Sequence, residues 1–177
     1  MAYHGTPQGA LAITGIPDAK KYFEPLTPGG FRVPNTNFYR AEYHQDDIKA
    51  YGRWAADRIA EAIEFEGADT VAAVFLEPVQ NSGGCFPPPP GYLERVRELC
   101  DEYNVVLIFD EVKTGLTAGA HGASARLGVK PDLITLAKSI GGGLPLAAFG
   151  GKQKYMDFVT NGKMAHFGTF NGNPLAM

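Results

Sequence analysis

Two short apolar runs with an amphipathic segment between them constrain the fold of this chain more than any other feature. Residues 70–76 (TVAAVFL) and 105–109 (VVLIF) are rich in β-branched and aromatic side chains. Continuous apolar runs of this length are typical of strands buried on both faces. Between the two runs, apolar residues recur at the spacing of one helix face: Tyr92, Val96, Leu99 and Tyr103. Strand, helix and strand in this order predict a right-handed βαβ unit, and therefore a parallel sheet.

The chain before this unit divides into two parts of different character. Residues 1–42 are rich in Gly, Pro, Asn and Thr, so we expect an irregular segment that crosses a surface. Residues 46–66 carry apolar side chains at spacings of three and four, which predicts an amphipathic helix. Either Asp46 or Asp47 can cap its start.

The chain after the unit contains two more candidate strands. Residues 132–136 and 146–149 are apolar and short, and a turn rich in glycine separates them. Residues 152–159 are expected to form a helix, and residues 173–177 resemble the start of another. The alternation of strands and helices predicts one α/β domain with a mostly parallel sheet.

Composition and spacing argue against several classes of function. The formal net charge of −3 provides no basic field for a nucleic acid backbone. Cys85 and Cys100 stand in no metal-binding or disulfide pattern, the four histidines have no metal spacing, and residues 141–143 (GGG) are not a P-loop. The first residues show no basic start followed by an apolar run, as a secretory leader would, and no apolar stretch approaches the length of a membrane span, so we expect neither secretion nor membrane insertion. We therefore expect a cytoplasmic protein without a metal, membrane or nucleic acid partner.

Two residues with complementary chemistry follow neighbouring strands of the predicted sheet. Asp110 comes directly after residues 105–109, and Lys138 comes just after residues 132–136. Because ligands bind outside the carboxyl ends of parallel strands, both side chains should face one crevice. They could form an ordinary ion pair there. They could equally be the amine and carboxylate that pyridoxal phosphate (PLP) needs, the amine for the imine and the carboxylate for the pyridine nitrogen.

Four segments surround these positions in a fixed order. They are residues 77–79 (EPV), 109–115 (FDEVKTG), 130–145 (KPDLITLAKSIGGGLP) and 168–174 (GTFNGNP). Together they resemble the motifs of class III, fold-type I aminotransferases, a family that includes glutamate-1-semialdehyde aminomutases. The resemblance extends over almost the whole chain. It implies a three-layer αβα large domain of the PLP-dependent transferase fold.

The resemblance implies a cofactor-binding role for five residues. Lys138 would carry PLP as a Schiff base, and Asp110 would pair with the pyridinium nitrogen. Val112 would pack under the ring, and Tyr3 would stack on its other face. His4 belongs to the same aromatic-His-Gly segment as Tyr3. Considered without the resemblance, Tyr3 is simply an aromatic residue near a chain end.

Thr169 is the sixth candidate, and its expected role depends on a second subunit. The turn formed by Gly168 and Thr169 resembles the family turn whose threonine reaches the phosphate of the neighbouring subunit's PLP. This implies a homodimer. Considered without the resemblance, a threonine after a glycine is more often a turn residue alone.

The chain departs from the family pattern in two residues and in length. Lys113 stands where many members have Gln or Met, and Ser82 stands where ornithine-type members have a Glu that gates the substrate carboxylate. Complete members are more than twice as long. We therefore expect residues 1–177 to be the central part of the PLP-binding large domain, without the phosphate-binding loop before Tyr3 and without the C-terminal small domain.

The resulting prediction is a PLP-dependent aminotransferase that moves an amino group from an amino acid or amine to a keto acid. Two alternatives stay open. One is an intramolecular aminomutase, similar to glutamate-1-semialdehyde 2,1-aminomutase. The other is a catalytically silent fragment, which the missing phosphate loop and small domain suggest.

Overall fold

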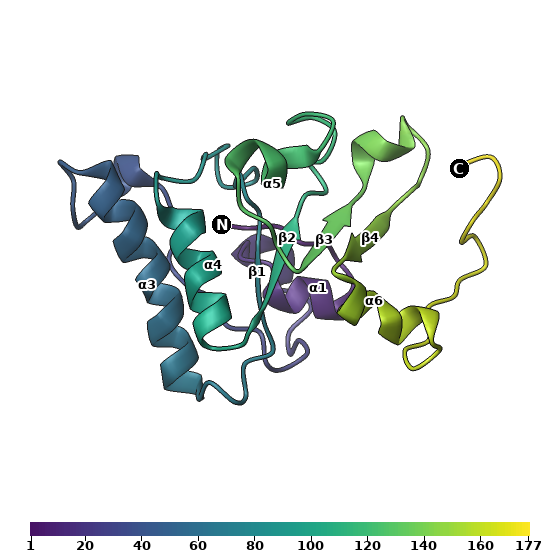
Figure 1. Cartoon of the computed structure of the whole chain (residues 1–177), viewed down its shortest axis with the longest axis horizontal. Helices are drawn as coiled ribbons and strands as arrows, with labels where there is room; N and C mark the ends of the chain where they lie inside the picture. Colours follow the sequence, from purple (N-terminus) through teal and green to yellow (C-terminus); the bar gives the residue numbers. More distant parts are fainter.

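The computed structural model describes all 177 residues, and a four-stranded sheet forms its centre (Figure 1). The strands lie in chain order: β1 (Ala73–Leu76), β2 (Val106–Asp110), β3 (Leu133–Leu136) and β4 (Ala148–Gly151). β1, β2 and β3 are mutually parallel, whereas β4 runs antiparallel to β3. The predicted α/β class and mostly parallel sheet are confirmed.

Helices connect and cover the strands. The α-helices are α1 (Gln8–Ile13), α2 (Pro17–Lys20), α3 (Ile48–Glu66), α4 (Tyr92–Glu102), α5 (Gly122–Leu127) and α6 (Gln153–Thr160), and the 3-10 helices are η1 (Phe38–Arg40) and η2 (Lys138–Gly141). α4 joins β1 to the parallel strand β2, as expected for a βαβ unit. None of these helices has the length and apolar content needed to cross a membrane.

α3 and α4 lie side by side and pack with the sheet to form the main core (Figure 1). From β2, Leu107 and Phe109 enter this core, and both are fully buried. α3 begins where predicted, because Asp47 accepts hydrogen bonds from two N–H groups of the first turn at 2.9 Å. A Cβ at Gly52 would lie only 2.5 Å from the Pro90 carbonyl oxygen, so glycine permits the close approach of α3 to the start of α4.

The N-terminal segment covers the opposite face of the sheet. α1 passes behind the strands in Figure 1, and Leu11 and Ala12 of α1 are buried. Residues that are paired in register on parallel strands point to the same face of the sheet, so the side chains of Asp110 in β2 and Thr135 in β3 share a face.

The sequence did not predict α1. Six residues have little helical propensity of their own, and burial of their apolar side chains stabilises the helix.

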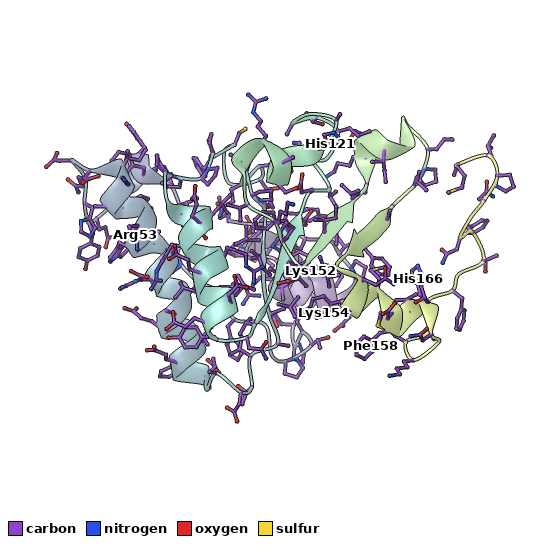
Figure 2. All side chains as sticks on the ribbon, viewed as in Figure 1. Arg53, His121, Lys152, Lys154, Phe158 and His166 are labelled. Atoms are coloured by element: carbon purple, nitrogen blue, oxygen red, sulfur yellow. The ribbon has the colours of Figure 1, made fainter.

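Asp132 joins four parts of the fold at the start of β3, and 3% of its surface is exposed. Its carboxylate accepts hydrogen bonds from the Leu107 N–H at 2.8 Å and from the Arg97 guanidinium at 2.9 Å. The Lys152 ammonium, between β4 and α6 (Figure 2), lies 2.7 Å from the other oxygen. Burial alone would raise the pKa of Asp132, but the donors from Lys152, Leu107 and Arg97 lower it below the ordinary value of 3.8.

The boundaries of several elements differ from the prediction. β1 starts at Ala73 rather than at residue 70, and β4 covers Ala148–Gly151 rather than residues 146–149. Leu146 still belongs to the preceding turn, because its N–H donates to the Leu144 carbonyl. The predicted helix start at the C-terminus is a single turn, in which the Asn173 carbonyl accepts the N–H of Met177 at 3.1 Å.

Candidate functional site

The carboxyl ends of β2 and β3 and the N-terminal segment enclose a pocket of about 220 Å³. Five of the six candidates predicted from the sequence line it: Tyr3, His4, Asp110, Val112 and Lys138. Thr169 does not. It lies exposed in the C-terminal segment, which runs away from the sheet (Figure 1). The structure thus brings five residues that are spread between positions 3 and 138 of the sequence to one pocket.

Asp110 is held by contacts on both carboxylate oxygens, and only 6% of the residue is exposed. Oδ1 accepts a hydrogen bond from the Val112 N–H at 3.0 Å, and Oδ2 lies 2.8 Å from His4 Nδ1. An ionised carboxylate only accepts hydrogen bonds, so Nδ1 of His4 carries the proton that Oδ2 accepts. Each oxygen keeps a lone pair for a further donor from the pocket.

Lys138 is the second residue after β3 and has an unusual backbone conformation. Its φ is 49°, and the preceding residue, Ala137, is extended. Left-handed geometry at a non-glycine residue costs about 1–2 kcal/mol and persists where neighbouring structure imposes it. Lys138 forms no ion pair within the chain, and Asp110 pairs with His4. The ordinary ion pair between Asp110 and Lys138, which the sequence left open, is therefore not formed.

One carboxylate and one threonine hold the segments that form the pocket walls. Glu77 lies at the end of β1, where Oε1 accepts the Tyr3 N–H and Oε2 accepts the Asn81 N–H, both at 2.9 Å. Buried Thr14 accepts the His4 N–H at 3.0 Å. Sequence reasoning assigned no function to Glu77 or Thr14. The position of Glu77 directly after a buried strand was the available signal, because it is the same signal that singled out Asp110.

One buried polar group near the pocket lacks a partner. Thr135 stands beside Asp110 in the sheet register, on the same face, and its Oγ1 has no hydrogen-bond partner. Buried hydroxyls in proteins are normally paired. Thr135 itself does not line the pocket, whereas the free lone pairs of Asp110 and the free amine of Lys138 face it.

Comparisons with known proteins show the family to which this chain belongs. The model of the class-III aminotransferase family matches residues 1–177. A probable aminotransferase of Mycobacterium tuberculosis is 60% identical over 99% of this chain, and 38% of that protein is covered. The glutamate-1-semialdehyde 2,1-aminomutase of Desulfovibrio desulfuricans is 42% identical over 99% of this chain, and 39% of that protein is covered.

Solved structures of transaminases have the same fold. A thermostable (S)-enantioselective omega-transaminase from Thermomicrobium roseum superposes with a TM-score of 0.88 at 33% identity, over 99% of this chain and 39% of that chain. A transaminase from a study of ancestral reconstruction gives a TM-score of 0.91 at 32% identity, over 99% of this chain and 40% of that chain. This chain therefore spans about two fifths of the length of these relatives.

Proposed function

The chain belongs to the class-III aminotransferase family, and we propose that it forms the PLP-binding part of a transaminase that passes an amino group from an amino acid or amine to a keto acid. One observation carries this proposal: Lys138 and Asp110 line the same pocket, and His4 holds the Asp110 carboxylate in position there. We infer that residues 1–177 are the central part of the large domain. The phosphate loop and the small domain would lie in the rest of a longer protein.

The pocket residues suit PLP in their chemistry. The cofactor offers an aldehyde for an amine, a ring nitrogen for a carboxylate and a flat ring for apolar and aromatic contacts. Lys138 supplies the amine and Asp110 the carboxylate. Val112 and Tyr3 supply the apolar and aromatic surfaces, and both line the pocket. An acidic side chain that is already oriented, and still able to accept another hydrogen bond, fits a protonated ring nitrogen.

Each residue would have a separate task in the reaction. When bound, PLP supplies a Schiff-base linkage and an electron-accepting ring for the carbon that loses a proton. Lys138 would hold the cofactor and, once a substrate amine has displaced it, would move the proton at the substrate's α-carbon. Asp110 would keep the proton on the ring nitrogen, and His4 would hold Asp110 in place through Nδ1. The side chains of Tyr3 and Val112 would keep the ring from tilting.

Borohydride reduction in the presence of PLP tests the assignment. Reduction fixes the cofactor to the lysine that carries it, and peptide mapping then locates the phosphopyridoxyl group. We expect the label on Lys138 and its loss in Lys138→Ala. Lys113→Ala is the matched control, because it removes the other lysine that lines the pocket. A label on another lysine would refute the role of Lys138, and no label at all would favour the catalytically silent fragment.

An intramolecular aminomutase is the second candidate, because two relatives are named glutamate-1-semialdehyde 2,1-aminomutase. An isotope experiment on the full-length protein separates the two reactions. Transfer of ¹⁵N from a labelled amino donor to a separate keto acid supports the transaminase. Strict retention of ¹⁵N within one molecule of substrate supports the aminomutase instead.

We also propose that the parent enzyme is a cytoplasmic homodimer. Thr169 is exposed and lies outside the pocket of its own chain, so it is free to reach the cofactor phosphate of a second subunit. Both cysteines are free thiols, as expected in a reducing compartment. Sedimentation of the full-length protein tests the dimer, and cell fractionation tests the compartment. A monomer that binds PLP normally would contradict the role of Thr169.

A further inference from the structure

Glu111 is a buried carboxylate next to Asp110 that the proposed chemistry does not use. Only 1% of the residue is exposed, and it does not line the pocket. Its Oε2 accepts the Ala123 N–H at 2.6 Å, and its Oε1 accepts the Ser124 N–H at 2.9 Å. The Thr114 hydroxyl lies 3.4 Å from Oε2. A buried carboxylate is costly unless it is hydrogen-bonded, and here all three donors belong to the segment that follows Glu111.

These contacts tie the loop after β2 to α5. The Glu111 backbone N–H donates to the Thr135 carbonyl at 3.0 Å, which continues the pairing of β2 with β3. The backbone of Glu111 is therefore attached to the sheet, while its side chain is attached to the first turn of α5. Residues 112 and 113, which both line the pocket, lie inside this constrained loop.

The shape of the loop also requires Gly122. Its φ is 73°, and a Cβ at this position would overlap Oε2 of Glu111. A side chain there would push the carboxylate out of its place. Glycine therefore leaves the space in which Glu111 meets the two N–H groups of α5.

The constraint reaches the pocket through Val112. Its backbone N–H donates to Asp110 Oδ1 at 3.0 Å, so the position of residue 112 decides whether this oxygen has its partner. His4 holds only the other oxygen. Loosening the loop would leave the Asp110 carboxylate with one of its two anchors.

We propose that Glu111 is a positioning residue for Asp110: by fastening the 112–121 loop to α5, it holds the Val112 N–H on the Asp110 carboxylate. Its effect on cofactor binding rests on the proposed function, whereas its effect on Val112 does not. Glu111 touches neither pocket nor ligand and acts only through the backbone.

Glu111→Gln tests the proposal, because the amide keeps one acceptor oxygen but cannot accept both N–H groups of α5. Two readouts apply to the full chain. Without cofactor, ¹⁵N-resolved hydrogen exchange reports the Val112 amide, which we expect to exchange about tenfold faster in the variant. With cofactor, fluorescence titration should give a PLP Kd about tenfold higher. Gly122→Ala should change both in the same direction, and exposed Glu94→Gln should change neither.

The outcomes separate positioning from simple destabilisation. If the amides of the α4 core, such as Leu99, accelerate as much as Val112 does, the variant has lost global stability and the proposal is wrong. An unchanged Val112 exchange rate in a folded Glu111→Gln variant would also overturn it. Absence of PLP binding by the unmodified chain would refute the proposed function, yet the exchange at Val112 would still decide the role of Glu111.

Discussion

Nδ1 of His4 lies 2.8 Å from Oδ2 of Asp110, although 106 residues separate the two in the chain. The contact joins the N-terminal segment to the end of β2, and only 3% of the His4 side chain is exposed. The His4 ring also meets Phe75 of β1 edge-on, with ring centroids 4.7 Å apart. Asp110 therefore has a fixed direction before any ligand arrives, which lowers the entropic cost of binding one.

His4→Phe should weaken PLP binding about tenfold, because it removes a hydrogen bond to a charged group while keeping a ring against Phe75. Fluorescence titration of the variant with PLP gives the dissociation constant. His44→Gln, at an exposed histidine outside the pocket, is the control and should bind as the unmodified chain does. Equal affinity in His4→Phe would show that His4 does not support Asp110.

Asp110→Asn should separate holding the cofactor from activating it. The amide is close in size to the carboxylate but carries no negative charge to keep the ring nitrogen protonated. We expect borohydride still to label Lys138, while conversion of PLP to its amine form by an amino donor slows by about 10²–10⁴-fold. Stopped-flow absorbance of the full-length enzyme measures that rate. An unchanged rate of this conversion in Asp110→Asn would contradict the proposed role of Asp110.

Asp132 lies outside the pocket and should make the free energy of unfolding depend on pH. Its three donors lower the pKa of Asp132 in the folded chain even though burial alone would raise it, so the ionised form stabilises the fold. This contribution is complete above the ordinary value of 3.8 and is lost as the pH falls through the lower folded value. Asp132→Asn should therefore reduce the unfolding free energy at pH 7 by about 3–5 kcal/mol.

Urea unfolding between pH 7 and pH 3 measures this dependence. The difference between the unmodified chain and Asp132→Asn should shrink as the pH approaches the acid end of the range. Asp101→Asn is the control, because that carboxylate pairs with the same Arg97 while mostly exposed. A difference that stays constant down to pH 3 would contradict the assignment to the Asp132 carboxylate.

The sequence predicted the elements that are marked by a continuous apolar run or by apolar residues at helical spacing. β2 and α3 were placed within about two residues, because apolar runs and the Asp47 cap are local signals. Asp110 and Lys138 could also be placed at one edge of the sheet, because parallel strands share a direction.

The contacts that orient the site were not predictable in the same way. The pairing of His4 with Asp110 and the bonds of Glu111 to α5 join residues far apart in the chain, and no local pattern encodes such contacts. α1 was missed because it depends on burial of Leu11 and Ala12 against the rest of the fold. Sequence reasoning thus singled out the two groups to which we assign the proposed chemistry, whereas their supporting partners required the folded chain.

The two cysteines should differ sharply in reactivity. Cys100 is buried in α4, and burial raises the pKa of its thiol to about 12, so the reactive thiolate is scarce at neutral pH. Cys85 is exposed. We expect the native chain to react with one equivalent of a thiol reagent, at Cys85, and with two equivalents after denaturation. Cys85→Ser should leave a native chain without reaction. Rapid labelling of Cys100 in that variant would mean that the packing of α4 on the sheet opens readily in solution.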